Sequence, residues 1–285
     1  MTVRTKSFRS VVKEYKAVFF DAFGVLKNHK GVIPGIERTF EYLDQKGIYY
    51  YILTNDSSRS PEALAQWYQD RGVKQVTTDK ILSSGMLAME FFSAKVSNGN
   101  AVAYLGTEDS AHYIETVGLQ TIPVREIDLN DIDHIESFAF LDDEGFNWNE
   151  DINKTVNLLR KKNMTVVVAN TDINYPVSKN DISVAIGSLA DMVENIIGKS
   201  FIRFGKPDAQ MFLLAYERAL KDIQVKRSEI LMVGDTLYTD IIGGNKFGLD
   251  TALVLSGNTL PEMAKIRISS SGIIPTYICE SAIIE

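Results

Sequence analysis

The sequence of 285 residues contains one cysteine, Cys279, and only three histidines. A single cysteine excludes an intramolecular disulfide and a cysteine-ligated zinc or iron–sulfur centre, and it is typical of a reducing compartment. No apolar run approaches the ~20 residues that span a bilayer. The apolar stretch after the basic N-terminus stops at Asp21, which is too short for a secretory signal. We therefore expect a cytoplasmic protein that has no membrane partner.

The sequence also lacks a surplus of basic residues. Thirty Lys and Arg residues stand against 37 Asp and Glu residues, which gives a net charge of −7. A nucleic-acid binder needs a basic face, so we expect no nucleic-acid partner. The 45% of hydrophobic residues suffices for a sizeable core, and the length allows one large or two modest domains.

Short apolar runs alternate with helical patterns along the chain. Runs that predict buried strands lie at 16–20, 48–53, 230–233 and 251–255. Helical patterns lie at 36–45, from the Ser60-Pro61 pair onward, at 208–220 and from about Thr239. This alternation predicts an α/β fold with a doubly wound parallel sheet, because parallel strands are covered on both faces and read as continuous apolar runs.

The middle of the chain has strand candidates of its own, at 101–105, 137–141 and 165–168, with helical segments between them. We read this part as a second α/β module inserted into the first. The predicted division is a core domain formed by 1–81 and 201–285, and an inserted domain formed by 82–200.

Polar side chains follow three of the predicted strands at their carboxyl ends. Asp21 follows the first, Thr54 and Asn55 end the second, and Asp235 follows a third, with Asp240 five residues later. Carboxyl ends of strands form the binding crevice of a doubly wound sheet, so these segments should converge. Each segment alone could be an ordinary capping turn. Two carboxylates close together favour a bound Mg²⁺, which takes carboxylate oxygens.

A fourth segment, Gly205-Lys206-Pro207, places a lysine just before a predicted helix. The order of the four segments, with Asp in the first, Thr-Asn in the second, Lys in the third and Gly-Asp in the fourth, resembles the haloacid dehalogenase (HAD) superfamily over the full chain. The long insertion resembles a C2-type cap, as in subfamily IIA, the enzymes similar to NagD and to 4-nitrophenylphosphatases. Segments 31–47 and 187–199 resemble that subfamily too.

The resemblance implies a Mg²⁺-dependent phosphatase that acts on a small phosphorylated metabolite of the sugar phosphate or nucleotide class. Asp21 would be the nucleophile that forms an aspartyl-phosphate, and Lys206 would neutralise charge beside it. Mg²⁺ would be held by Asp21, the backbone carbonyl of Phe23 and Asp235, and Asp240 would either be a ligand through water or orient Lys206.

The resemblance also implies where the substrate binds. Thr54, Asn55 and Gly24 would hold phosphoryl oxygens. The loop at 169–178, which contains Asn170, corresponds best to the specificity loop of the cap. Caps of this kind often form dimers, so a homodimer through the cap is expected on the same ground.

One residue departs from the family pattern. The phosphatases carry a second Asp, the general acid/base, where this chain has Phe23, and such catalysis contributes about 10²–10⁴-fold. Three interpretations stay open: a phosphatase of low activity or one whose leaving group needs no proton, an impaired phosphate-ligand binding protein, and a HAD member with non-phosphatase chemistry. His29 is a candidate substitute for the missing acid. A dinucleotide-binding oxidoreductase is rejected, because G-x-G-x-x-G does not follow the first strand.

Overall fold

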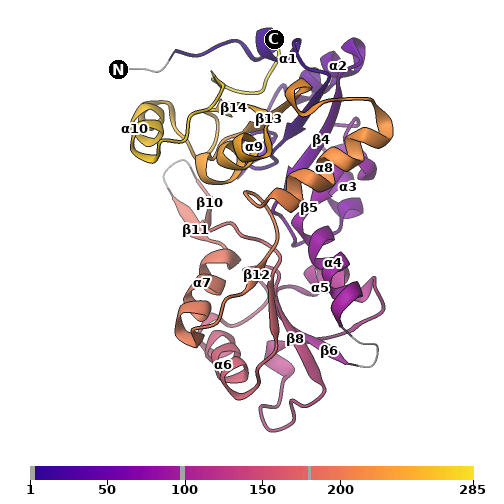
Figure 1. Ribbon diagram of the computed structural model, residues 1–285, viewed down its shortest axis with the longest axis vertical. Coiled ribbons are helices and arrows are strands. Elements are labelled where there is room, and N and C mark those ends of the chain that lie inside the picture. The colour runs from indigo at the N-terminus through magenta and orange to yellow at the C-terminus, as the bar shows by residue number, and fades with distance from the viewer. Residues whose placement is uncertain (1–3, 97–99, 179–180) are drawn as a thin grey trace.

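The computed structural model describes residues 4–96, 100–178 and 181–285 of the chain. Two separate parallel sheets form its framework, one above the other in the view of Figure 1. Among the described residues, no helix is both long and apolar enough to cross a membrane.

The first sheet has six strands, and every adjacent pair is parallel. Their order across the sheet is β15 (Tyr277–Cys279), β14 (Asp250–Val254), β13 (Ile230–Gly234), β1 (Ala17–Phe20), β4 (Tyr49–Thr54) and β5 (Ile81–Ser83). The predicted strands at 16–20, 48–53, 230–233 and 251–255 are thus confirmed to within a residue or two at each end. The α/β parallel fold class is confirmed with them.

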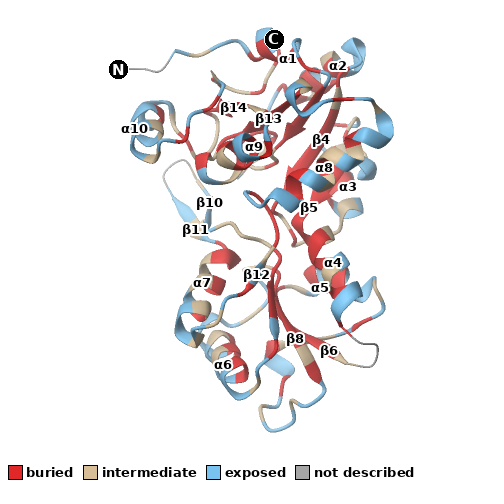
Figure 2. Cartoon of the chain, in the orientation of Figure 1, coloured by how far each residue is buried: buried red, intermediate tan, exposed pale blue. Residues whose placement is uncertain are grey.

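Helices cover both faces of this sheet, so every residue of a strand such as β1 is buried (Figure 2). Val18 and Phe20 face the helices α1 (Phe8–Val12), α2 (Ile36–Lys46) and α3 (Pro61–Gln69). Ala17 and Phe19 face the opposite side, with α8 (Ala209–Asp222) and α9 (Ile242–Phe247). The last helix, α10 (Pro261–Ser271), packs through Ala264 on a smaller cluster at the end of β14. Successive side chains of each strand point to opposite faces of the sheet, so both faces are apolar and helices pack on both, which is the doubly wound arrangement.

The second sheet has five parallel strands. Their order is β12 (Ile202–Arg203), β9 (Thr165–Val168), β8 (Ile135–Phe140), β6 (Ala101–Leu105) and β7 (Gln120–Pro123). Helices α6 (Trp148–Lys161) and α7 (Ile186–Ile197) pack on one face, and α4 (Ser84–Lys95) and α5 (Glu108–Glu115) pack on the other. This sheet is the inserted module that the sequence predicts.

The strands at the edges of the insertion cross the predicted domain limits by a few residues. Leu82 and Ser83 pair with β4 in the first sheet, and Ile202 and Arg203 pair with β9 in the second. The apolar cluster around α4 also includes residues of both sheets, so α4 joins the two modules.

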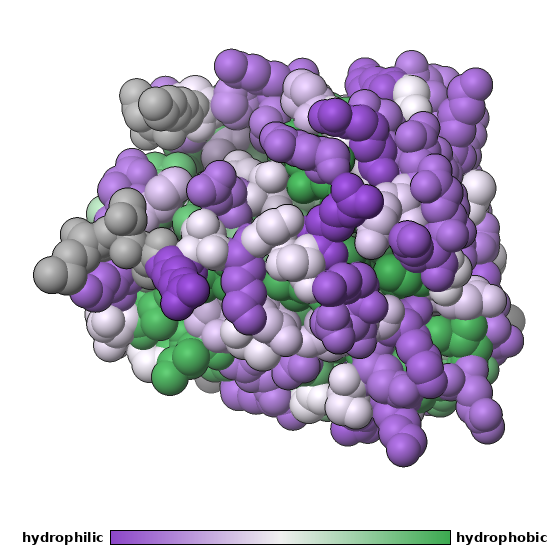
Figure 3. All heavy atoms as spheres, turned by 90° about the horizontal axis from the view of Figure 1, so that it is seen from above, coloured by the Kyte–Doolittle hydropathy of each residue, from purple (hydrophilic) through white to green (hydrophobic). Residues whose placement is uncertain are grey.

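Two short hairpins complete the described fold. The first joins β2 (Lys27–Asn28) to β3 (Gly31–Val32) just after the first sheet strand. The second joins β10 (Asn174–Pro176) to β11 (Ile182–Val184), and Figure 1 shows it between α7 and the helices α9 and α10. Hydrophilic residues cover most of the face seen from above in Figure 3, where apolar residues appear only in separate patches.

The helix predicted from about Thr239 begins differently. A turn of π-helix spans Leu237–Ile241, and α9 starts only at Ile242. In this turn the N–H of Ile241 donates to the carbonyl of Thr236, five residues earlier (3.3 Å). The wider turn lets the carboxylate of Asp240 face back toward the end of β13, where it also accepts from the N–H of Thr236 (3.1 Å).

Candidate active site

A cleft of about 1520 Å³ opens between the two sheets. Residues that follow β1, β4, β13 and β14 line one side, and loops of the inserted module line the other. Seven of the predicted site residues line it: Asp21, Phe23, Gly24, Thr54, Asn170, Lys206 and Asp235. The other two, Asn55 and Asp240, are buried behind its wall. The convergence that the strand ends predict is therefore present in the structure.

Lys206 is the cation of the site, and its side chain is only 2% exposed. Its Nζ is hydrogen-bonded to a carboxylate oxygen of Asp21 and lies 2.9 Å from Oδ1 of Asp240. Burial by itself lowers the pKa of a lysine, but the Asp21 and Asp240 carboxylates outweigh burial and hold the pKa of Lys206 above its usual value. Lys206 is therefore a fixed positive charge and not a proton donor at neutral pH.

Asp235 lies in a space that two glycines leave open. A Cβ atom on Gly24 would lie 2.0 Å from Oδ2 of Asp235, and one on Gly257 would lie 1.9 Å from it. The N–H of Asn258 donates to Oδ2 (2.6 Å), and the hydroxyl of Thr236 donates to Oδ1 (2.9 Å). These contacts fix the carboxylate at the carboxyl edge of the sheet.

Asp21, Asp235 and Asp240 each offer a carboxylate oxygen within 4.8 Å of the other two. Burial raises the pKa of Asp235 to about 7, with the Asp240 charge adding to the effect. Burial also raises the pKa of Asp21 well above its ordinary value, against the opposing charge of Lys206. Three crowded carboxylates against one ammonium leave an excess of negative charge, so the donor set fits a divalent cation such as Mg²⁺.

Replacing Lys206 with Met is expected to lower the free energy of unfolding by about 3–5 kcal/mol in the presence of EDTA. The substitution keeps the length of the side chain but leaves the carboxylates of Asp21 and Asp240 buried without a cation. Urea unfolding measures the loss. Lys16→Met is the matched control, because the Lys16–Glu229 pair lies at the surface, where water and salt screen it, so its removal should destabilise the fold much less. Equal losses in the two variants would contradict this account of the cluster.

Thr54 ends strand β4 and Asn55 follows it, and both are buried. The Oγ1 of Thr54 accepts from the N–H of Asp56 (3.1 Å). The amide of Asn55 makes a two-way bond with the backbone of Lys206: its Oδ1 accepts from the N–H (2.7 Å) and its Nδ2 donates to the carbonyl (3.1 Å). The Asn55 side chain thus holds the loop that carries the lysine, a role that the sequence did not indicate.

The same amide also reaches the inserted module. Nδ2 of Asn55 lies within hydrogen-bonding distance of the Thr171 hydroxyl (3.2 Å) and of Asp172 Oδ1 (2.9 Å). Gly205 passes close by with a φ of +123°, and a Cβ atom there would lie 2.7 Å from Oδ1 of Asn55. A glycine is therefore required before the lysine.

Gly24 and Asn170 line the cleft, but their polar groups are partly engaged elsewhere. The N–H of Gly24 donates to the carbonyl of Lys27 (2.7 Å), which closes the turn after β1. The Oδ1 of Asn170 accepts from the N–H of Asp172 (2.8 Å). Gly24 is needed in any case for the close approach of Asp235, at a positive φ of 82°.

Phe23 directs its ring to the cleft, where it lies edge-to-face with the ring of Tyr175 from β10 (6.4 Å between centroids). The hydroxyl of Tyr175 donates to Asp143 of the inserted module (2.8 Å). His29 lies exposed on the β2–β3 hairpin and also lines the cleft.

The segment after β14, residues 256–258, is a part of the site that the sequence did not predict. Besides Gly257 and Asn258, Ser256 contributes a hydroxyl that donates to the carbonyl of Gly24 (2.7 Å). Ser-Gly-Asn follows a predicted strand, as the other site segments do, so its position in the chain was the available signal. Lys27 was also missed; it pairs with Asp56 in the cleft (3.2 Å).

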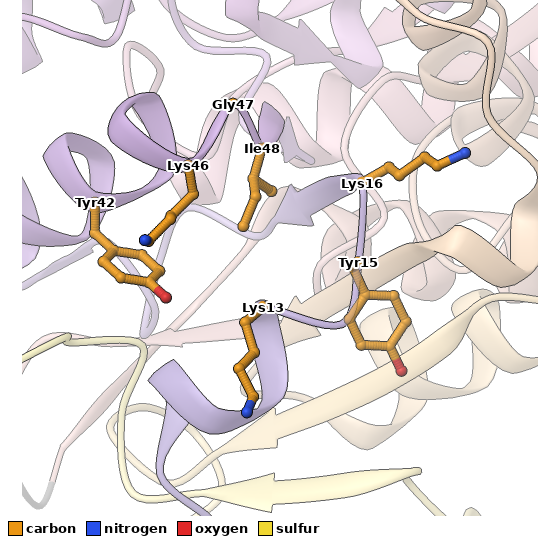
Figure 4. A pocket seen from close by; sticks show the side chains of 7 residues that line it. All are labelled: Lys13, Tyr15, Lys16, Tyr42, Lys46, Gly47 and Ile48. Carbon is orange, nitrogen blue, oxygen red and sulfur yellow. The ribbon is translucent and has the colours of Figure 1, made fainter.

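A second, smaller pocket of about 410 Å³ lies at the opposite edge of the first sheet, where β1 and β4 begin. Its lining contains none of the predicted site residues: Lys13, Tyr15, Lys16, Tyr42, Lys46, Gly47 and Ile48. Figure 4 shows Lys46 beside Tyr42, whereas Lys16 extends away from both and pairs with Glu229 (2.7 Å). The predicted site residues therefore lie in or directly behind the large cleft and not in this pocket.

The fold is a Rossmann-like core whose cleft lies beneath an inserted module. Residues 18–120 match the family model of haloacid dehalogenase-like hydrolases, and residues 203–282 match a second HAD-hydrolase-like model. A solved structure from Cytophaga hutchinsonii, described as a possible sugar phosphatase of the HAD superfamily, is 55% identical, covers 99% of both chains and has a TM-score of 0.95. The chain belongs to the HAD superfamily of hydrolases, which confirms the resemblance read from the sequence.

More distant relatives are also similar to this chain. Chronophin of Mus musculus is 27% identical over 98% of this chain and 94% of its own length. NagD from Escherichia coli, the type of the predicted subfamily, has the same fold at 24% identity, with a TM-score of 0.73 and coverage of 95% and 98% of the two chains. A glycerol phosphate phosphatase from Mycobacterium tuberculosis in complex with magnesium is also similar in fold, at 24% identity, a TM-score of 0.76 and coverage of 98% and 78%.

Proposed function

We propose that the protein is a Mg²⁺-dependent phosphatase that acts on a small phosphorylated metabolite through Asp21. The observation that carries this proposal is the grouping of Asp21, Asp235, Asp240 and Lys206 at one edge of a parallel sheet, where all but the buried Asp240 line a cleft beneath the cap. The solved relative at 55% identity is described as a possible sugar phosphatase, which supports a sugar phosphate as the class of substrate.

The residues that would hold Mg²⁺ are Asp21, the carbonyl of Phe23 and Asp235, while Asp240 would act through water or orient Lys206, whose Nζ lies 2.9 Å from it. Their crowded carboxylates fit the cation, and the magnesium complex of the M. tuberculosis relative supports the choice of metal. Bound there, Mg²⁺ would neutralise charge on the phosphoryl oxygens.

Asp21 would perform the covalent step. One of its carboxylate oxygens attacks phosphorus, a new P–O bond forms, and the bond to the leaving oxygen breaks with its electron pair. Water then hydrolyses the aspartyl-phosphate, which releases phosphate and restores the carboxylate. Lys206 stays charged throughout and stabilises the negative charge next to Asp21. Thr54, the backbone N–H of Asn55 and Gly24 would hold the phosphoryl oxygens, and Asn170 would contact the substrate from the cap side; Thr54, Gly24 and Asn170 line the cleft.

Phe23 favours a second candidate function, the binding of a phosphorylated ligand with little turnover. Its ring stands where the family places the general acid/base, and a phenyl group transfers no proton. Both candidates use the same cleft and the same charges, so they differ only in the rate of turnover.

Release of inorganic phosphate from phenyl phosphate and from small sugar phosphates tests the proposal. We expect turnover with Mg²⁺ and a loss of at least about 10²-fold after EDTA treatment, restored by added Mg²⁺. Thermal shifts with the same compounds identify ligands independently of turnover. Stabilisation without phosphate release would contradict the phosphatase and favour the binding protein.

Three further expectations remain predictions. The division into a core (1–81 and 201–285) and a cap (82–200) rests on the insertion of the second sheet. A homodimer through the cap is supported by the exposed apolar side chains Met192 and Ile196 on α7, and light scattering would test it. A cytoplasmic location rests on the single cysteine, Cys279, which is free and buried.

A further inference from the structure

The backbone of Lys206 lies outside the described helices and strands, while its ammonium lies between the carboxylates of Asp21 and Asp240. Side chains hold both backbone polar groups of this lysine. The N–H donates to Oδ1 of Asn55 (2.7 Å), and the carbonyl accepts from the hydroxyl of Thr171 (2.8 Å) and from Nδ2 of Asn55 (3.1 Å). The position of the ammonium therefore depends on one residue of the core and one residue of the inserted module.

The bond from the Thr171 hydroxyl is the shorter of the two on this carbonyl, and it is not shared. Nδ2 of Asn55 has two protons, but three acceptors lie within its reach: the Lys206 carbonyl, the Thr171 hydroxyl (3.2 Å) and Oδ1 of Asp172 (2.9 Å). The amide divides its protons among them, whereas the Thr171 hydroxyl directs its one proton to the carbonyl. Without this hydroxyl, the Lys206 carbonyl would keep only its part of the amide.

Thr171 is itself fixed to the inserted module. It lies on the loop between β9 and β10, and this loop packs against the start of α7. The N–H of Gly187 donates to the carbonyl of Asp172 (3.2 Å), and the hydroxyl of Ser188 donates to the carbonyl of Ile173 (2.7 Å). A Cβ atom on Gly187 would lie 2.5 Å from the carbonyl oxygen of Asp172, so the loop and the helix are in close contact. The position of the Thr171 hydroxyl therefore follows that of the inserted module.

We propose that Thr171 is a positioning residue of the reaction, through which the inserted module sets where the Lys206 ammonium lies against Asp21. This inference rests on the proposed phosphatase function and adds a residue to its machinery. A fixed charge lowers the barrier when it lies where negative charge develops, and a misplacement of about 1 Å can cost about 10²-fold in rate. The side chain of Thr171 also lines the cleft. A contact with the substrate would change KM, whereas a positioning role changes kcat.

Thr171→Val and Thr171→Ser form the matched pair that tests the proposal. Val keeps the branched shape without the hydroxyl, and Ser keeps the hydroxyl without the methyl group. With phenyl phosphate and saturating Mg²⁺, we expect Thr171→Val to lower kcat by about 10–10²-fold and to change KM by less than about 3-fold, which is the pattern of an interaction that acts in the transition state. Thr171→Ser should keep kcat within about 3-fold of the wild type.

Thr155→Val is the control for the loss of a threonine hydroxyl. The Thr155 hydroxyl is buried in α6 of the same module, donates to the carbonyl of Asp151 over the same distance (2.8 Å) and lies outside the lining of the cleft. We expect kcat of this variant to stay within about 2-fold of the wild type. Urea unfolding of both Val variants shows that each is folded under the conditions of the assay.

The outcomes separate this inference from the function on which it rests. Equal kcat in the wild type and Thr171→Val would overturn the inference and leave the phosphatase standing. A raised KM with unchanged kcat would overturn it too, because Thr171 would then be a substrate contact. Equal losses of kcat in the Val and Ser variants would overturn it as well, because they would show that the hydroxyl is not the group that acts. Absence of phosphate release by the wild type from every ester, with Mg²⁺ present, would overturn the proposed phosphatase itself.

Discussion

Asp21→Asn is expected to lower phosphate release by at least about 10³-fold, because an amide oxygen does not replace a carboxylate as the nucleophile. Asn has the shape of Asp and keeps an oxygen near Lys206, so the fold should persist. The loss is measured as kcat with phenyl phosphate and saturating Mg²⁺. A residual rate above about a tenth of the wild type would contradict the role of Asp21.

Asp56→Asn is the matched control for this experiment. Asp56 also pairs with a lysine in the cleft, Lys27 (3.2 Å), and that lysine together with the Ser58 bonds outweighs burial and lowers the pKa of Asp56. The substitution removes a comparable ion pair and keeps the three crowded carboxylates. We expect it to shift the melting temperature at least as much as Asp21→Asn but to cost less than about 10-fold in kcat.

Phe23→Asp is expected to raise kcat/KM for alkyl phosphates such as benzyl phosphate by about 10²–10⁴-fold. The new carboxyl group would stand beside the leaving oxygen and could protonate it. The ring contact with Tyr175 would be lost, and a fourth carboxylate would join Asp21, Asp235 and Asp240. We therefore also expect lower thermal stability in EDTA, with recovery on addition of Mg²⁺.

Phe23→Asn separates acid catalysis from the removal of the ring. Asn is as small and polar as Asp, but it donates no acidic proton, so no gain with benzyl phosphate is expected. Equal gains in the Asn and Asp variants would show that the ring merely blocks the cleft. No gain in either variant would contradict the account of the missing acid.

The sequence predicted the parts of the site that depend on the backbone. Apolar strands ending at Asp21, Thr54 and Asp235 had to converge, because parallel strands share one carboxyl edge. Lys206 was found through the order of the segments and the family resemblance. These are the features that local sequence pattern and topology determine.

The remaining features depend on contacts between segments distant in the chain. The amide of Asn55 reads in sequence as part of a phosphate-binding turn, but it holds the backbone of Lys206, 151 residues away. The pairing of Phe23 with Tyr175 likewise depends on how the cap packs over the core. The π-turn before α9 was missed because its wider winding follows from the need of Asp240 to face Lys206, which no helical periodicity records.

Asp21 is expected to form a covalent bond to phosphorus, and the mass of the peptide that contains Asp21 tests this most directly. Wild-type protein with Mg²⁺ and phenyl phosphate is quenched in acid, digested and analysed by mass spectrometry. We predict one added phosphoryl group on Asp21, present in the wild type and absent in Asp21→Asn. Phosphate release without any phosphoryl group on Asp21, or the same label in the Asn variant, would contradict the account.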